Sequence, residues 1–371
     1  MSEERATVVA PAVLETVVAR LRDDGYRVVG PTVENGAIVY ADLESAADLP
    51  IGWRDVQDAG SYRLERRGDE ARFGFAVGPH SWKRYLFPPR VQLWTARRDQ
   101  EVAEATVDDA PLAFFGIRAC ELHAIEIQDR VFIRGRFTDR DYAARREGAF
   151  FVAVNCFEPG GTCFCASMGT GPAVESGFDL ALTELLDGDH RFLVEAGTDR
   201  GLELLRRLPG REPTATDLAA ARTSVEDARD RMGRRLDTTD LRDVLLGSLE
   251  HPRWDDVAAR CLGCANCTLV CPTCFCSAVE DTTDLTGEEA ERVRVWDTCF
   301  ALDHSYIHGG SIRPSARSRY RQWLTHKFAT WVDQFGTDGC VGCGRCITWC
   351  PVGIDVTEEL QALREPEQVD G

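Results

Sequence analysis

Hydrophobic positions in the first part of the chain follow two alternating patterns. Short, nearly continuous apolar runs occur at PLAFFGI, FFVAVNC and RFLVEAG, and they are separated by segments with apolar residues at helical spacing, such as ELHAIEIQDRVF. Continuous apolar runs of this length are typical of strands that helices cover on both faces. The pattern predicts an N-terminal domain of the α/β or α+β class.

The N-terminal segment predicts more local elements. Residues 11–24 place apolar side chains at helical spacing after Pro11, which favours an amphipathic helix. The segment RVVGPTVENGAIVYADL has two β-rich runs around Asn35-Gly36, and SYRLERRGDEARFGFAV has two more around residues 67–69. Turn residues between such runs are typical of hairpins, so we expect a hairpin at each turn.

The pattern changes after residue 213. Residues 214–250 are strongly charged and helical in pattern, and we interpret them as a helical linker. Residues 251–371 hold two dense groups of cysteines, separated by an insert that includes RSRYRQWLTHKFATWVDQF, which has helical apolar spacing. We therefore predict an α/β domain over 1–213, the linker, and a mainly helical, ferredoxin-like domain over 251–371.

Charge and composition narrow the classes of function. The chain has 371 residues, 44% of them hydrophobic, and a formal net charge of −18. A charge of this sign repels nucleic-acid phosphates, which argues against a nucleic-acid partner. Since no apolar run approaches the roughly 20 residues of a membrane span, we expect no membrane partner and a cytoplasmic protein.

The cysteine count changes the picture most. Fifteen cysteines are an odd number, and the cytoplasm keeps thiols reduced, so a disulfide framework is the weaker explanation. Metal ligation is favoured. Six of the fifteen lie within the sixteen residues CLGCANCTLVCPTCFC.

Eight cysteines form a repeated motif. Both CLGCANCTLVCP and CVGCGRCITWCP fit the spacing CxxCxxCxxxCP, the signature of bacterial two-cluster ferredoxins. In this motif the first three cysteines bind one [4Fe-4S] cluster and the fourth binds the other. One predicted cluster therefore has the ligands Cys261, Cys264, Cys267 and Cys350, and the other has Cys340, Cys343, Cys346 and Cys271.

Zinc sites and buried free thiols are the alternatives. CxxC pairs also bind zinc, but zinc motifs do not usually form a repeated four-cysteine run that ends in proline. Buried free thiols do not explain why eight cysteines repeat the same spacing. Small residues within the runs, such as Ala265, Gly342 and Gly344, let backbone N–H groups approach cluster sulfurs and raise the reduction potential.

Four further cysteines suggest a third iron–sulfur site. They follow predicted strands, and the loops after such strands share one edge of a sheet, where ligands usually bind. The alternative is that they are small buried hydrophobic residues. Other substitutes remain open, including His123 as a ligand, although a lone histidine is more often structural. The hypothetical third site comprises Cys120, Cys156, Cys163 and Cys165, with Cys274, Cys276 and Cys299 as substitute ligands.

A basic stretch, SIRPSARSRYRQWLTHK, stands out in this acidic chain. It would face an acidic partner, offset the charge of anionic clusters, or form a solvated helix face. The sequence leaves these three interpretations open.

Several catalytic signatures are absent. The sequence contains no GxGxxG after a strand, no GxxxxGK[ST], no GxSxG and no HExxH. We therefore expect no flavin or nucleotide on this chain, no catalytic residues of its own, and a role in electron transfer. The rivals are a thiol enzyme in which a CFC motif cycles between dithiol and disulfide, and a protein whose clusters are structural or act as a sensor.

Longer phrases carry a family resemblance. Five segments together resemble the β subunit of cytosolic sulfhydrogenases, the NAD(P)-linked nickel–iron hydrogenases: FGIRACELHAIEIQDRVF, NCFEPGGTCFCASMGTGP, CLGCANCTLVCPTCFC, RYRQWLTHKF and GCVGCGRCITWCPVGID. The same architecture is also similar to the iron–sulfur component of anaerobic sulfite reductase. The first resemblance implies a complex in which this chain passes electrons between a flavin subunit that binds NAD(P) and the hydrogenase subunits. The second implies an iron–sulfur subunit of a sulfite or sulfur reductase.

Overall fold

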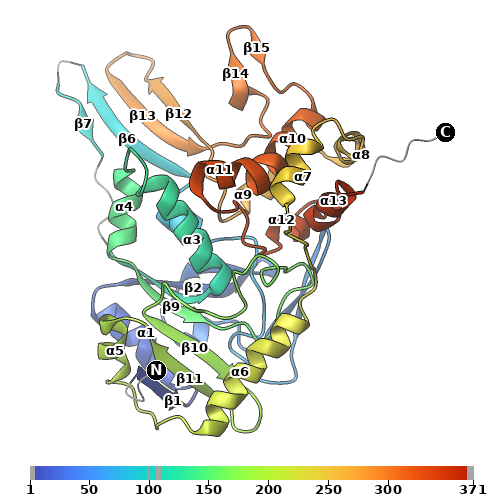
Figure 1. The fold of residues 1–371 in the computed structure, drawn as a ribbon. Helices are drawn as coiled ribbons and strands as arrows, with labels where there is room; N and C mark the ends of the chain where they lie inside the picture. The colour runs from blue at the N-terminus through green and yellow to red at the C-terminus, as the bar shows by residue number, and fades with distance from the viewer. Residues whose placement is uncertain (1–4, 99, 106–109, 366–371) are drawn as a thin grey trace.

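The computed structural model describes residues 5–98, 100–105 and 110–365. A seven-stranded sheet forms the lower half of the molecule in Figure 1, with the strand order β1-β11-β10-β9-β8-β2-β3. Its strands are β1 (Ala6–Val9), β2 (Arg27–Glu34), β3 (Ala37–Asp42), β8 (Leu112–Arg118), β9 (Phe150–Val154), β10 (Leu180–Leu185) and β11 (Arg191–Ala196).

The centre of this sheet is parallel. Strands β2, β8, β9 and β10 pair in parallel, and β1, β3 and β11 join antiparallel towards the edges. Every residue of β8, β9 and β10 is buried, because helices cover both faces. The apolar runs at 111–117, 150–156 and 191–197 thus form strands, as the sequence predicts.

Two layers of helices cover the sheet. Apolar residues of α1 (Val13–Asp23) and α5 (Asp199–Leu205) pack in one core with Phe115 and Val152. The opposite face, with Phe114 and Phe151, packs against α3 (Ala119–Phe132) and α4 (Arg140–Glu147). The short helix α2 (Lys83–Leu86) joins this second core, and α6 (Ala215–Asp230) packs on β10 and β11.

Helices dominate the upper half of the molecule (Figure 1). All of them except α11 contribute to a separate core that includes Trp254, Trp323 and Leu360, and Trp331 of α11 packs in another cluster with Cys343. The helical segments are α7 (Leu241–Gly247), α8 (Arg253–Arg260), α9 (Asn266–Leu269), α10 (Ala316–Thr325), the π-helical η4 (His326–Thr330), α11 (Trp331–Phe335), α12 (Arg345–Thr348) and α13 (Val356–Ala362).

The prediction of a mainly helical C-terminal domain is wrong between residues 277 and 296. Strands β12 (Ser277–Thr283) and β13 (Glu289–Trp296) form a four-stranded antiparallel sheet with β6 (Arg90–Arg97) and β7 (Ala103–Glu104). β13 pairs with β6 from Glu289↔Arg97 to Val295↔Arg90, so a strand distant in sequence satisfies its backbone groups.

That sheet joins strands from both parts of the chain. The division at residues 213 and 250 therefore remains a prediction. A further hairpin, β14 (Tyr306–Ile307) and β15 (Gly310–Ser311), projects at the top of Figure 1. No helix among the described residues is long and apolar enough to cross a membrane.

One predicted hairpin is confirmed and the other is wrong. β2 and β3 pair around Asn35-Gly36, both of which have positive φ. The second hairpin instead joins β4 (Trp53–Asp58) to β5 (Ser61–Arg66) and turns at Ala59-Gly60. The chain beyond β5 is irregular because tertiary partners take its backbone groups: for example, the Phe73 N–H donates to Glu184, 2.8 Å away.

Candidate iron–sulfur centres

The two cysteine runs have the same local backbone. Gly263 and Gly342, each two residues after the first cysteine, have φ of 63° and 64°, and their N–H groups both donate to the preceding cysteine Sγ at 3.4 Å. Ala265 and Gly344, each one residue after the second cysteine, have φ of 67° and 74°. This left-handed geometry curls each run into a tight loop whose amides face sulfur, as a bound cluster requires.

A short helix follows each loop. α9 and α12 pack against each other, and the Asn266 side-chain amide donates to the Trp349 carbonyl oxygen at 3.2 Å. Cys350, after α12, lines one cavity with Cys261, Cys264 and Cys267. Cys271, after α9, raises the pKa of Cys340 and Cys346, so each fourth cysteine lies near the loop of the other run. The exchange of ligands between the two clusters stays a prediction.

The first candidate centre lies near the surface. Burial raises the pKa of Cys267 well above its usual value, and the thiols of Cys261, Cys350 and Cys264 raise it further. Cys264 is exposed, and the aromatic side chains Phe300, Tyr320 and Trp323 form one wall of the site. A single cavity is lined by Cys261, Cys264, Cys267 and Cys350, together with Cys346.

The second candidate centre is buried deeper. Burial raises the pKa of Cys340 to about 12, and Cys343 and Cys271 contribute to the increase. Burial likewise raises the pKa of Cys346, with contributions from the other three thiols of this set. Four thiolates this close repel one another, and they fit a cationic iron core because metal binding deprotonates thiols outright.

The cysteines of the hypothetical third site also come together. Cys120 is the second residue of α3, Cys156 follows β9, and Cys163 and Cys165 lie in the loop beyond. Burial raises the pKa of Cys165, and the thiols of Cys163 and Cys156 raise it further. Cys120, Cys163 and Cys165 share one buried apolar cluster with Cys343 of the second centre.

The loop that contains Cys163 and Cys165 packs directly on the second run. The Phe164 N–H donates to the Gly342 carbonyl oxygen at 2.8 Å, and the Thr170 hydroxyl donates to the Val341 carbonyl oxygen at 2.7 Å. A Cβ on Gly344 would come within 2.4 Å of the Thr162 carbonyl oxygen. The glycine therefore permits the loop with Cys163 and Cys165 to approach the second centre.

A buried ion pair also joins the second run to the α/β part. The guanidinium of Arg345 pairs with the carboxylate of Glu121, and both side chains are almost completely buried. Glu121 also accepts hydrogen bonds from the Tyr40 hydroxyl at 2.7 Å and the Trp82 indole N–H at 2.6 Å. The carboxylate is thereby fully satisfied.

The residues proposed as substitute ligands for the third site lie outside the group formed by Cys120, Cys156, Cys163 and Cys165. A hydrogen bond from Cys274 lowers the pKa of Cys271, so Cys274 lies beside the second centre. A hydrogen bond from Cys299 lowers the pKa of Cys276 to about 6. His123 lines a groove between α3, α6 and the sheet, together with residues such as Asn155.

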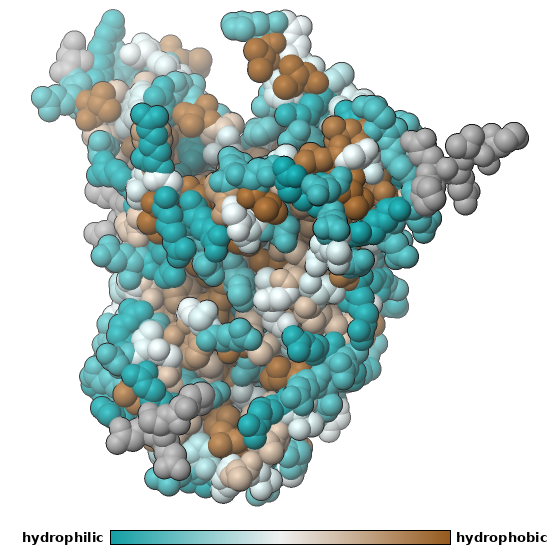
Figure 2. Space-filling model, in the orientation of Figure 1, coloured by the Kyte–Doolittle hydropathy of each residue, from teal (hydrophilic) through white to brown (hydrophobic). Residues whose placement is uncertain are grey.

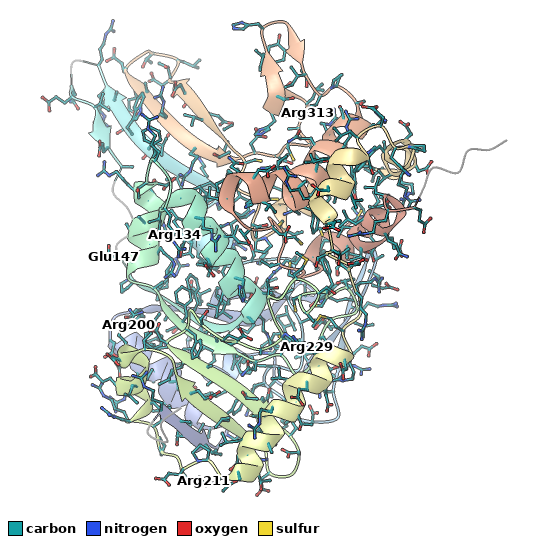
Figure 3. The ribbon with its side chains drawn as sticks, in the orientation of Figure 1. Arg134, Glu147, Arg200, Arg211, Arg229 and Arg313 are labelled. Atoms are coloured by element: carbon teal, nitrogen blue, oxygen red, sulfur yellow. The ribbon has the colours of Figure 1, made fainter. Side chains whose placement is uncertain are left out.

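The basic stretch divides between two environments. Arg317 and Arg321 form ion pairs with Glu250 at 3.2 and 3.0 Å, a solvated arrangement, and Arg313 lies just before α10 (Figure 3). Lys327, in contrast, is buried, and its Nζ donates to Cys271 Sγ at 3.3 Å. Along the sequence nothing distinguishes Lys327 from its basic neighbours, and Lys83 belongs to no motif.

Among the residues that the structure describes, no group of three or more histidine, cysteine or acidic side chains is arranged around the position of a single metal ion. A cube with four thiolate ligands differs from such a site, because each thiolate bonds a different iron atom.

Comparison with known proteins supports the iron–sulfur interpretation. The family model of a 4Fe-4S dicluster domain matches residues 260–354. The chain is 34% identical over 315 residues to sulfhydrogenase 2 subunit beta of Pyrococcus furiosus, an alignment that covers 84% of this chain and 91% of that protein. No solved structure matches the chain.

Proposed function

The chain belongs to the sulfhydrogenase β-subunit family, and from this premise we propose that it passes electrons between a flavin subunit that oxidises or reduces NAD(P)(H) and the nickel–iron subunits of a hydrogenase complex. The observation that carries the proposal is the pair of matching cysteine loops, each with the fourth cysteine of the other run beside it, in the region that the dicluster-domain model matches. A bound [4Fe-4S] cluster supplies a centre that takes up and releases one electron.

The ligand sets follow the two candidate centres. Their amide-lined loops and exchanged fourth cysteines support this assignment. The chain's own part is to hold the thiolates, orient backbone amides toward sulfur and exclude water from the inner centre. We assign Cys261, Cys264, Cys267 and Cys350 to the first cluster and Cys340, Cys343, Cys346 and Cys271 to the second.

A third cluster extends the route. Cys120, Cys156, Cys163 and Cys165 supply four thiols at one edge of the sheet, next to Cys343. The Arg118 guanidinium donates to Cys156 Sγ at 3.7 Å and would offset the charge of an anionic cluster there. The three centres then form a continuous series from the exposed first loop to the edge of the sheet.

The first centre is the proposed contact with a partner protein. Its ligand Cys264 is exposed, and apolar side chains around it are exposed as well: Leu262 by 66%, Leu269 by 41% and Val352 by 39%. Apolar side chains also gather at the β14–β15 hairpin on the face shown in Figure 2. Exposed apolar residues beside a redox ligand favour a protein partner at this surface.

The location of the complex is also a proposal. Fifteen cysteines, an odd number, suit a compartment that keeps thiols reduced, and we therefore place the complex in the cytoplasm. The relative found by comparison is a sulfhydrogenase subunit, which favours a hydrogenase complex over the sulfite reductase alternative.

Metal analysis of the anaerobically purified full chain tests the proposal. We expect roughly eight iron atoms and as many sulfides per chain for two cubes, and roughly twelve for three. Zinc in place of iron, or iron without acid-labile sulfide, would contradict the electron-transfer function. A stoichiometry of two cubes would reject the third site alone.

A further inference from the structure

The chain contains two lysines among its 43 basic residues, and both are buried beside the second centre. Lys83 in α2 is 4% exposed, and Lys327 in the π-helical segment η4 is 3% exposed. They come from opposite parts of the chain and reach the same short segment, residues 269–274. The remaining basic residues are arginines, so lysine occurs only at this location.

Lys327 contacts the exchanged ligand directly. Its Nζ donates to Cys271 Sγ at 3.3 Å, Thr273 Oγ1 at 3.1 Å and the Gly339 carbonyl oxygen at 2.8 Å. The Thr273 hydroxyl itself donates to Gly339 O at 2.6 Å, so its oxygen accepts from the lysine. Three acceptors require three N–H donors, which only the charged ammonium supplies.

Lys83 holds the other side of the same segment. Its Nζ donates to the Cys274 carbonyl oxygen at 3.0 Å and to the Leu269 carbonyl oxygen at 3.5 Å. The ammonium also lies 4.1 Å from the centre of the Trp296 ring, a cation–π contact.

Neither ammonium has a carboxylate partner in the part of the chain that the structure describes. Burying an unpaired cation is costly, so such cations persist where a negative group compensates them. The group available here is the thiolate-ligated centre, whose net charge is negative. Lysine suits the position because its compact ammonium fits among three close acceptors, whereas a planar guanidinium does not.

Among the described residues, no lysine or arginine side chain donates a hydrogen bond to a cysteine sulfur of the first centre, where the Gly263 N–H donates to Cys261 Sγ. Cys350 occupies the place that Cys271 has in the second centre, and the Asn266 amide reaches the Trp349 carbonyl oxygen beside it. The nearby Arg319 donates to the carbonyl oxygens of Arg313 and Pro314. A buried cluster is harder to reduce than an exposed one, because reduction adds negative charge in a medium of low dielectric.

We propose that Lys83 and Lys327 are positioning residues that form a buried cationic pair, and that this pair raises the reduction potential of the cluster held by Cys340, Cys343, Cys346 and Cys271. The pair offsets the cost that burial imposes on the reduced state. The cluster of the second centre, the inner cluster, thereby accepts electrons from the exposed cluster of the first centre. This inference rests on the proposed function, because it requires that both clusters are bound.

A redox titration of the anaerobic full chain, followed by electron paramagnetic resonance, tests the inference. In Lys327→Met we expect the ratio of reduced to oxidised inner cluster at a fixed potential to fall at least tenfold, a shift of 59 mV to lower potential for a one-electron couple. The first cluster is the internal reference and stays unchanged. Arg242→Gln, which removes an exposed cation near α11, is the matched control and shifts neither cluster.

Lys83→Met provides the second measurement, because Lys83 bonds to carbonyl oxygens and not to a ligand sulfur. A shift of the inner cluster in this variant supports the inference even if Lys327→Met loses iron. Unchanged potentials at full iron content in either variant overturn it. Loss of iron from both variants also overturns it, because the lysines would then hold the segment and not tune the cluster. Wild-type protein without two clusters would instead contradict the proposed function.

Discussion

The two cysteine runs have one spacing and one backbone geometry but lie in different surroundings. In the first run Cys264 and Leu262 are exposed, and a solvent-facing cavity adjoins the loop. In the second run Val341 and Cys343 are buried beneath the loop at residues 160–172. The residue directly before the third cysteine also differs between the runs. Asn266 in the first run is exposed, whereas Arg345 in the second run is almost completely buried.

This difference separates two kinds of information. Residue spacing and left-handed positions shape each cluster loop, whatever surrounds it. The surroundings decide whether the loop meets a partner or relays electrons internally. The second run has become an internal element because glycines at 342 and 344 admit a covering loop, and because Glu121 supplies a counter-charge to the cation at 345.

Removing an inner ligand should have the largest effect. Cys343→Ala is expected to lose roughly four iron atoms per chain and to stop electron flow, because one cube loses a thiolate. The far-ultraviolet circular dichroism of the α/β part should persist. Iron and sulfide analysis checks the outcome, with Cys299→Ala as the control that retains the full iron content. Unchanged iron in Cys343→Ala would show that the ligand assignment is wrong.

The buried ion pair provides the next test. Glu121→Gln leaves the Arg345 guanidinium buried without a counter-charge, so we expect a loss of about 3–5 kcal/mol in the free energy of unfolding. Asn266→Ala, at the equivalent position of the exposed run, removes one exposed hydrogen bond and should cost about 1 kcal/mol. Chemical denaturation of anaerobic protein measures both. Equal losses of unfolding free energy in the two variants would show that the two runs do not differ in how strongly this position stabilises the fold.

A glycine comparison measures the cost of covering the second run. Gly344→Ala adds a clash with Thr162 to an unfavourable φ of 74°, and Gly287 on an exposed turn has the same φ with nothing nearby. We expect Gly344→Ala to destabilise by about 2–5 kcal/mol. Gly287→Ala should cost about 1–2 kcal/mol. Thermal unfolding distinguishes them, and similar midpoints would argue against close packing at 344.

The smallest effect is expected at the equivalent position of the first run. Ala265 has φ of 67°, and Ala265→Gly relieves a strain of about 1–2 kcal/mol. The lost methyl burial costs about 0.8 kcal/mol, so the net stabilisation should be roughly 0.2 to 1.2 kcal/mol. Calorimetry of the variant beside wild type measures this. A clear destabilisation would mean that the packing of the Ala265 methyl group contributes more free energy than its left-handed backbone strain costs.

Local sequence patterns predict the structure where neighbours in sequence decide it. The Asn35-Gly36 turn, the buried strands and both cysteine loops depend on short-range sterics and hydrophobic periodicity. The failures share a cause. β13 pairs with β6, and Phe73 bonds to Glu184, so in each case a distant partner overrides the local preference.

By itself the sequence determined the chemistry of this protein, because thiolate spacing and left-handed glycines specify a cluster loop without reference to the rest of the chain. Only the tertiary structure decided which loop is exposed, that Cys120, Cys163 and Cys165 pack beside Cys343, and that both lysines reach the segment around Cys271. These features join residues far apart in sequence. Long-range packing and the burial of charge create them, and neither leaves a periodic signal along the chain.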